Sequence, residues 1–213
     1  IVSADSDIYT VGDLYSKNVS VGEDESGVMQ NAKQILAVNG LTFNNINASY
    51  LSFSDSAEAL KSGAIDAFFC TAGAPTTSVQ ELSKEIDIRL ISLDSRTCKQ
   101  LIQEYPCYVE RVIPAGTYQG QDEDVTTLGV KAVLVVSNKL SDDFVIALTE
   151  TLFTHSTELQ YATSADAIDK EFAVEAIPVP FHSGAAKWYE QQGIQVGSSD
   201  GGNTGYGVDA SQD

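Results

Sequence analysis

Residues 19–40 read VSVGEDESGVMQNAKQILAVNG and combine a strand, a tight turn and a helix. Val19 to Val21 has the β-branched character of a short strand, and Ser26 stands where the N-cap of a helix is expected. The apolar residues of the helix recur at three- and four-residue spacing: Met29, Ala32, Ile35 and Leu36. Asn39-Gly40 is a typical C-terminal stop. The stretch therefore predicts a β-strand followed by an α-helix.

The same alternation of strands and helices continues to residue 104. We expect further strands at 47–53, 67–70 and 89–92. We expect helices at 56–62, opened by a capping box of Asp55 and Glu58, at 75–85 and at 95–104. The run 67–70 is apolar throughout, as in a strand that helices cover on both faces. The fold class is therefore predicted as α/β, with a parallel sheet and 67–70 as a central strand.

A long segment rich in Pro, Gly and acidic residues, 105–126, interrupts this pattern and is predicted to be irregular. Beyond it we expect a strand at 129–137 and helices at 142–155, 165–174 and 184–191, the first of them capped by Ser141. Gly, Ser, Asp and Asn dominate the C-terminus and predict a mobile tail. The predicted parts of the chain are therefore 1–126, 127–196 and 197–213.

Acidic residues dominate the charge of the chain. Its 213 residues carry 30 Asp and Glu against 12 Lys and Arg, a net charge of -18. This balance repels phosphate backbones, so nucleic acid is not expected as a partner. No run of the sequence approaches the roughly 20 apolar residues of a membrane-spanning helix. Three cysteines are too few for a disulfide framework, and Cys98 and Cys107 are candidates for one pair.

Two predicted loops, Gly22–Gly27 and Thr71–Pro75, follow strands at the edge where open α/β sheets bind ligands. Each leads into a helix, whose first backbone N–H groups carry partial positive charge and suit a carboxylate. The first loop is no phosphate-binding P-loop, since it lacks the required Lys and contains three acidic residues at 23–25. The alternative is purely structural: Ser26 caps its helix, and residues 73–75 make a turn.

Catalytic chemistry has weaker support from the sequence. Cys70 is the candidate nucleophile, but both histidines, His155 and His182, lie far along the chain, and a small buried hydrophobe is the favoured interpretation of Cys70. A carboxylate pair stays open as an alternative, because the chain has 30 acidic residues. No cluster has zinc-ligand spacing and no calcium loop is complete, so we expect neither a metal nor another cofactor.

Several segments together carry a family resemblance. They are 19–22 (VSVG), 26–36 (SGVMQNAKQIL), 51–55 (LSFSD), 59–67 (ALKSGAIDA), 71–75 (TAGAP), 89–93 (RLISL), 113–118 (IPAGTY) and 180–185 (PFHSGA). Over residues 5–193 the chain resembles the TAXI family, the extracytoplasmic solute receptors of TRAP transporters. Two positions depart from the family pattern, Glu25, where we expect a small residue, and Val28, where we expect Ser or Thr.

The resemblance implies a type II periplasmic-binding-protein-like fold, in which two α/β lobes close on a small ligand such as glutamate or another dicarboxylate. Residues 1–126 would form one complete ligand-binding lobe. Residues 127–196 would be the return strand and C-terminal helices of the other lobe, most of whose N-terminal part would precede Ile1. By position in the family pattern, the expected ligand contacts are Ser26, Gly27, Val28, Asn31, Thr71, Ala72 and Gly73.

The sequence therefore predicts a non-catalytic extracytoplasmic receptor. Its expected partners are a small carboxylate or amino-acid ligand and the membrane subunits of a TRAP transporter. The alternatives are an enzyme that uses Cys70 or a carboxylate pair, and a sensory or surface module on the same fold. Because an N-terminal lobe would normally cover the apolar faces after residue 126, we also expect the chain either to self-associate or to rearrange the helices that follow.

Overall fold

The computed structural model describes residues 1–158, 169–175, 177 and 179–197. The chain divides into two compact units, Ile1–Val130 and Lys131–Asp213. The division falls after Val130, beyond the boundary predicted at residue 126. Of the predicted tail, all but Gly197 lies outside the described residues, as do residues 165–168 of the predicted helix 165–174.

A five-stranded sheet forms the centre of the first unit. Its strands are β1 (Val2–Ser3), β2 (Asn18–Ser20), β3 (Asn47–Ser49), β4 (Ala67–Phe68) and β5 (Ile88–Arg89). The order β3-β2-β4-β1-β5 makes β4 central, as its apolar run predicted. β2 pairs in parallel with β3 and β4, whereas β1 runs antiparallel to β4 and β5. The α/β class is confirmed. The sheet is mixed rather than parallel, because the two-residue strand β1, which the sequence analysis did not predict, runs antiparallel to its neighbours.

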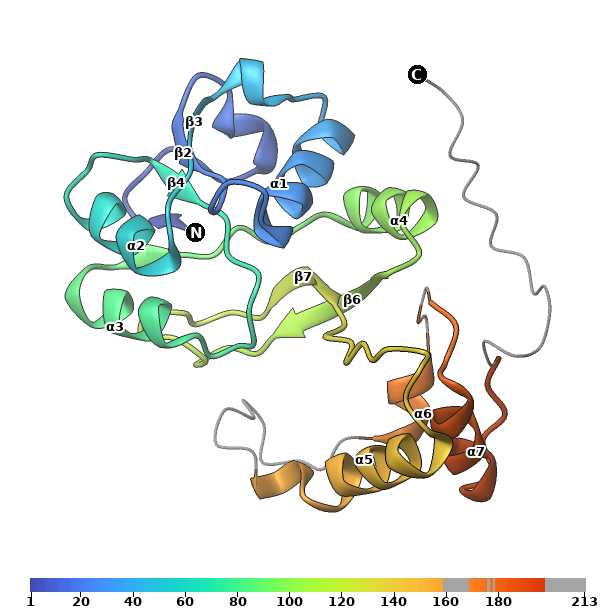
Figure 1. Cartoon of the computed structure of the whole chain (residues 1–213). Helices are drawn as coiled ribbons and strands as arrows, with labels where there is room; N and C mark the ends of the chain where they lie inside the picture. The colour runs from blue at the N-terminus through green and yellow to red at the C-terminus, as the bar shows by residue number, and fades with distance from the viewer. Residues whose placement is uncertain (159–168, 176, 178, 198–213) are drawn as a thin grey trace. The chain divides into compact units, whose positions relative to one another are not determined.

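Helices cover both faces of this sheet (Figure 1). They are α1 (Gly27–Val38), α2 (Phe53–Lys61), α3 (Thr77–Glu85) and α4 (Ser95–Glu104), with short 3-10 turns η1 (Val11–Leu14) and η2 (Phe43–Asn45). α1 packs beside α4, and α2 packs beside α3. The periodicity of the sequence located α1 and α4 correctly, since both helices are long and carry Ser26 and Asp94 as side-chain caps.

Alternation along the strands divides the core into two clusters. Ala67 belongs to the cluster packed on α1, whereas its neighbour Phe68 belongs to the cluster that contains Leu60 of α2, because successive strand residues point to opposite faces. Ser20 is fully buried on the α2 side, where its hydroxyl oxygen lies 2.8 Å from that of Ser56. This hydrogen bond satisfies two hydroxyls that would be costly to bury alone.

The prediction for the start of α2 was wrong by one turn. α2 begins at Phe53, and its N-cap is Ser52, whose Oγ accepts a hydrogen bond from the backbone N–H of Asp55 at 3.2 Å. The Ser52 hydroxyl in turn donates to the Asp55 carboxylate at 2.7 Å. The Asp55 side chain thus supports the Ser52 cap instead of being the cap, and the strand predicted at 47–53 ends at Ser49.

The segment predicted as irregular, 105–126, contains half of a β-hairpin. β6 (Tyr108–Ile113) pairs antiparallel with β7 (Val125–Val130), from Tyr108 opposite Val130 to Ile113 opposite Val125. The prolines at 106 and 114 lie just outside β6, where they remove no ladder hydrogen bond. The connection is held by the Gln121 side chain, which donates to the carbonyl oxygens of Ile113, Pro114 and Glu123. The strand predicted at 129–137 is β7, which starts earlier and ends at Val130.

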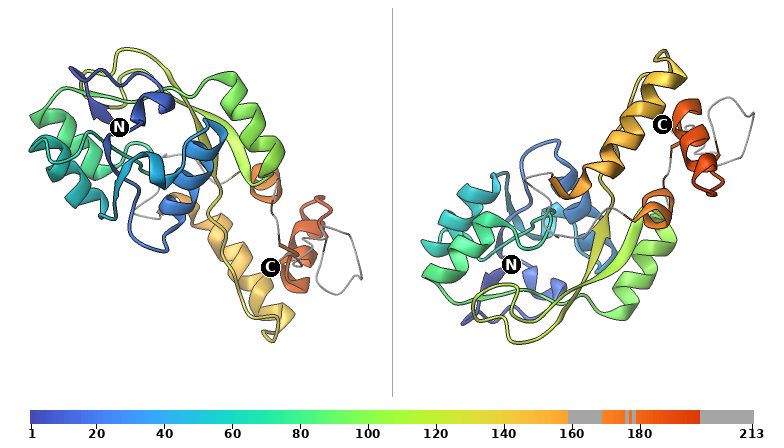
Figure 2. Two further views of the ribbon diagram at one scale, coloured as in Figure 1. Left: turned by 90° about the horizontal axis from the view of Figure 1, so that it is seen from above. Right: turned by 90° about the horizontal axis from the view of Figure 1, so that it is seen from below.

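Helices make up the regular structure that is described in the second unit. They are α5 (Asp142–Thr154), η3 (Ser156–Glu158), α6 (Lys170–Val174) and α7 (Ser183–Gln191). α5, capped by Ser141 as predicted, lies beside α7 (Figure 2). A Cβ on Gly184 would lie 2.6 Å from the Asp142 carbonyl oxygen, so only glycine permits this approach. His182 Nδ1 accepts from the N–H of Gly184 at 3.0 Å and caps α7.

The turn between β2 and α1 has two residues in the left-handed backbone region. Gly22 has φ +91° and Glu25 has φ +58°. A Cβ built on Gly22 would lie 2.6 Å from the Cβ of Val28, a residue that α1 holds in place. The turn therefore needs glycine at position 22 both for its backbone angle and for the close approach of Val28.

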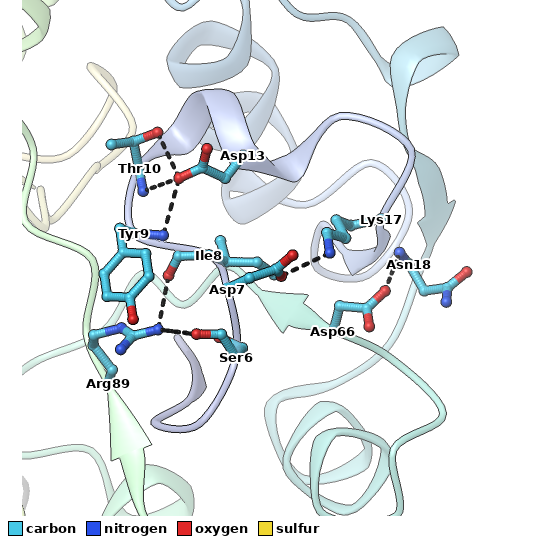
Figure 3. Close-up of polar contacts among 10 residues, drawn as sticks. All are labelled: Ser6, Asp7, Ile8, Tyr9, Thr10, Asp13, Lys17, Asn18, Asp66 and Arg89. Atoms are coloured by element: carbon cyan, nitrogen blue, oxygen red, sulfur yellow. Dashed lines mark hydrogen bonds and ion pairs between the residues drawn. The ribbon is translucent and has the colours of Figure 1, made fainter.

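Arg89, at the end of β5, holds the loop between β1 and η1 (Figure 3). Its guanidinium donates to the carbonyl oxygens of Ala4 at 3.0 Å, Ser6 at 2.7 Å and Ile8 at 3.1 Å. The ring of Tyr9 covers it, with the guanidinium carbon 4.0 Å from the ring centroid. Arg89 Nε is buried without a partner within the described residues. A planar fork of donors is needed to reach three carbonyl oxygens at once, and lysine has none.

We expect Arg89→Lys to lower the free energy of unfolding by about 2–3 kcal/mol, because hydrogen bonds from a charged donor to buried carbonyls are lost. Urea denaturation measures this change. The matched control is Arg96→Lys on the exposed surface of α4, for which we expect a change below about 0.5 kcal/mol. Equal effects of the two substitutions would contradict the role given to Arg89.

We expect Gly22→Ala to cost about 3–4 kcal/mol, because strain at positive φ adds to a clash with Val28. Gly40 has φ +75° and open space where a Cβ would stand, with no atom within 4 Å. Gly40→Ala therefore measures backbone strain alone, about 1–2 kcal/mol. The comparison by thermal and urea denaturation isolates the contribution of the close approach. A smaller loss for Gly22→Ala than for Gly40→Ala would contradict this interpretation.

Candidate functional site

The two loops predicted as ligand contacts lie side by side. β2 and β4 are neighbouring parallel strands, so the loops that follow them leave the sheet at the same edge. Asn31, in the second turn of α1, joins the loops: its Nδ2 donates to the Thr71 hydroxyl oxygen at 3.0 Å. The structure thus brings together two of the seven predicted residues that are 40 positions apart in the sequence.

The first loop presents backbone donors at the start of α1. Ser26 caps the helix by accepting from the N–H of Met29 at 3.1 Å. The N–H groups of Gly27 and Val28 precede the first intrahelical hydrogen bond, which Gln30 makes to the Ser26 carbonyl oxygen, and no described residue accepts from them. These two N–H groups and the helix dipole favour an anion at this position.

Thr76, directly after the second loop, holds the backbone of that loop in place. Thr76 donates from its hydroxyl to the Gly73 carbonyl oxygen at 2.8 Å and from its N–H to the Tyr118 hydroxyl oxygen at 3.0 Å. Thr71 is half-buried, and Ala72 and Gly73 are exposed. These contacts hold the backbone of the loop while leaving its Ala72–Gly73 tip accessible to a ligand.

The sequence did not indicate that Tyr108 of β6 belongs to this site. Its hydroxyl lies 2.8 Å from Asn31 Oδ1 and 2.5 Å from Gln34 Oε1, where its single proton can serve one acceptor at a time. Burial raises the pKa of Tyr108 to about 12, so the phenol is neutral at physiological pH. Tyr108 fixes the orientation of the Asn31 amide, which in turn donates to Thr71. No sequence motif signals this contact, because β6 and α1 meet only through the fold.

An apolar cavity of about 170 Å³ adjoins the second loop and Asn31 of α1. Asn31, Thr71 and Ala72 line it, whereas Ser26, Gly27, Val28 and Gly73 do not. Most of the other lining side chains are aliphatic or aromatic and come from the sheet, α1 and the β6–β7 hairpin. The predicted contacts therefore divide into residues that face the cavity and residues of the α1 N-terminus and loop tip.

No histidine lies in the same unit as Cys70. Cys70 lines the cavity next to β4, and burial raises the pKa of its thiol. Both histidines belong to the second unit, His155 as the C-cap residue of α5 and His182 as the cap of α7. A thiol with a raised pKa is a poor nucleophile at neutral pH.

All three cysteines are free thiols in the structure. Cys98 is fully buried in α4 and Cys107 is exposed before β6, so the candidate pair is not formed. Among the described residues, no group of three or more His, Cys, Asp or Glu side chains is placed to hold a metal ion. The groups at the two loops are hydrogen-bond donors, apolar side chains and the exposed acidic side chains of residues 23–25.

Comparison with known proteins gives a family and similar solved structures. One of these structures is the periplasmic aliphatic sulphonate binding protein SsuA from Escherichia coli, which has 19% sequence identity and a TM-score of 0.39. The alignment covers 90% of this chain and 60% of that protein, so the chain spans 60% of its length. In the described ranges, no helix is both long and apolar enough to cross a bilayer. The NMT1-like family matches residues 1–193, and the chain therefore belongs to the NMT1-like family.

Proposed function

We propose that this chain is a solute-binding protein that holds a small carboxylate at the loops after β2 and β4. Membership of the NMT1-like family, which is periplasmic-binding-protein-like, supports a binding role. The observation that most directly supports this site is the hydrogen bond between Asn31 and Thr71, which joins α1 to the second loop. Open α/β sheets bind their ligands at this edge of the sheet.

The chemistry of the two loops favours an anionic oxygen group. The N–H groups of Gly27 and Val28 donate to one carboxylate oxygen, and the Thr71 hydroxyl, whose proton has no acceptor among the described residues, donates to the other. The positive end of the α1 dipole adds a favourable contribution. Asn31 holds Thr71 in place from the α1 side.

The acidic residues 23–25 oppose an anion at this site. All three side chains are exposed to solvent, where water and salt screen their charges within about 8 Å at physiological ionic strength. They weaken the attraction of the loops for a carboxylate without abolishing it. They also leave open a favourable contact with an ammonium group, as in an amino-acid ligand.

The proposal extends to the TAXI family and to delivery of the ligand to the membrane subunits of a TRAP transporter, in an extracytoplasmic compartment. Its support is the resemblance of segments such as 26–36, 59–67 and 71–75. Glutamate and other dicarboxylates are the ligands that this resemblance implies. Within the proposal, residues 1–126 act as the ligand-binding lobe, and residues from 127 onward belong to the other lobe.

An enzyme is the less favoured function, since Cys70 has a raised pKa and no histidine in its unit. A sensory or surface module on the same fold would use the same ligand site without a transporter. The transporter receptor and the sensory or surface module differ in their protein partners. Both would bind a ligand at this site, as tested by the titration that follows.

We expect carboxylates such as acetate and glutarate to shift the ¹⁵N amide resonances of Gly27, Val28, Ala72 and Gly73 during an NMR titration at constant ionic strength. Thr71→Val removes one donor while keeping the shape of the side chain, and we expect it to weaken carboxylate binding about three- to tenfold. Thr77→Val, in the exposed first turn of α3, is the matched control and leaves binding unchanged. Chloride is the control for non-specific anion effects; equal shifts with chloride would contradict the proposal.

We expect iodoacetamide at pH 8 to modify Cys107 at least tenfold faster than Cys70 or Cys98, because Cys107 is exposed and burial raises the pKa of the other two thiols. Mass spectrometry of tryptic peptides gives the three rates. In 6 M guanidinium chloride the three rates should become similar. Faster modification of Cys70 than of Cys107 in the folded protein would favour the enzyme instead.

A further inference from the structure

The cavity beside Asn31 and Thr71 has the size of a small organic group. Its volume is about 170 Å³, and an apolar cavity of roughly 150 Å³ in another protein holds benzene. Protein interiors otherwise contain few voids larger than a water molecule. A space of this size next to the second loop and Asn31 can hold a body of about six carbon atoms.

The lining of the cavity has no charged side chain, and its one ionisable backbone group is the amine of Ile1, which donates to the Phe68 carbonyl oxygen at 2.9 Å and whose pKa burial lowers to about 6. Apart from Asn31, its polar lining residues are hydroxyl-bearing or a thiol: Cys70, Thr71, Thr76, Tyr108, Thr127 and Tyr118. Four of these hydroxyls already make hydrogen bonds: Tyr118 with the N–H of Thr76, Tyr108 with the Asn31 and Gln34 amides, Thr76 with the Gly73 carbonyl oxygen, and Thr71 with Asn31. The remaining surface comes from aliphatic and aromatic residues of both the sheet and the β6–β7 hairpin.

A second negative charge on the ligand could pair only with the Ile1 amine, and at pH 7.5 that amine is mostly neutral because burial lowers its pKa to about 6. An ionised carboxylate or ammonium group loses its hydration on burial, and only a countercharge or several hydrogen bonds offset that cost. An apolar group, by contrast, gains affinity on entering, at about fourfold for each buried methylene. The cavity thus discriminates between ligands that share a carboxylate head and differ in the rest of the molecule.

We propose that the cavity binds the uncharged, apolar body of the ligand, so that the ligand is a monocarboxylate with an aliphatic or aromatic group of about six carbon atoms rather than glutamate or another dicarboxylate. This inference rests on the proposed carboxylate site. Asn31 and Thr71 stand where the two parts of the ligand meet, because they belong both to the joined loops and to the lining of the cavity.

The test is an NMR titration of the 213-residue chain, labelled at backbone amides and at the methyl groups of Ile, Leu and Val. Pentanoate and glutarate are a matched pair of five-carbon acids, in which glutarate has a carboxylate in place of the terminal methyl. We expect pentanoate to bind at least tenfold more tightly. We also expect affinity to rise about fourfold per methylene from acetate to pentanoate, with shifts at the methyl groups of Ile35, Leu128 and Val130.

A cavity-filling variant gives a second measurement. Leu128→Trp places a larger side chain in the lining, and we expect it to weaken pentanoate binding at least tenfold while leaving acetate binding unchanged. Leu51→Trp, at a half-buried leucine outside the lining, is the matched control and should leave both affinities unchanged. Leu128→Phe is the milder substitute where the tryptophan variant does not fold, and the pentanoate–glutarate comparison needs no variant.

The outcomes separate this inference from the proposed function. Tighter binding of glutarate or glutamate than of pentanoate would overturn the inference and leave the carboxylate site in place. Methyl shifts with 1-pentanol, but no amide response to any carboxylate, would overturn the carboxylate function and keep the cavity as a site for an apolar group. No response to any of these compounds would overturn both and identify the cavity as a packing void.

Discussion

The parallel pairing of β2 with β4 is the constraint on which the candidate site depends. Val19 opposite Ala67 and Ser20 opposite Phe68 set the register, and a slip of one residue would move every side chain of a strand to the other face of the sheet. The core fixes this register strongly, because Val19 and Phe68 are almost completely buried on opposite faces. With the register fixed, the loops that follow the two strands are adjacent, and Asn31 can reach Thr71.

The elements that could be predicted from the sequence are those whose signals are local. α1 and α4 have long apolar periodicity and their own capping side chains, so that few distant contacts are needed to specify them. β4 was predictable as the central strand because burial on both faces requires an apolar run. The two loops could also be placed at one edge of the sheet, because that prediction needs only the order of the strands and helices.

The elements that could not be predicted depend on distant partners. β1 has only two residues, and it is a strand only because of its pairing: Val2 pairs with Ala67 of β4 on one side and with Arg89 of β5 on the other. β6 contains exposed charged residues and is flanked by prolines, so its strand structure comes from pairing with residues 125–130 across a turn that the Gln121 side chain holds. The contact of Tyr108 with Asn31 spans 77 positions and has no sequence motif. The part of the candidate site at the helix N-termini could therefore be predicted from the sequence, whereas the cavity, which depends on long-range contacts, could not.

The magnitudes of the available interactions indicate which part of a ligand this chain can recognise most strongly. A helix N-terminus contributes about 0.3–1 kcal/mol to an exposed anion, and the net charge of -18 together with the acidic residues 23–25 opposes that attraction. Each methylene that leaves water contributes about 0.8 kcal/mol. A body of three or four buried methylenes therefore outweighs the charge of the head group. In the proposed site, the donors of the two loops would orient the ligand, and the largely apolar cavity beside Tyr108 would supply most of the affinity.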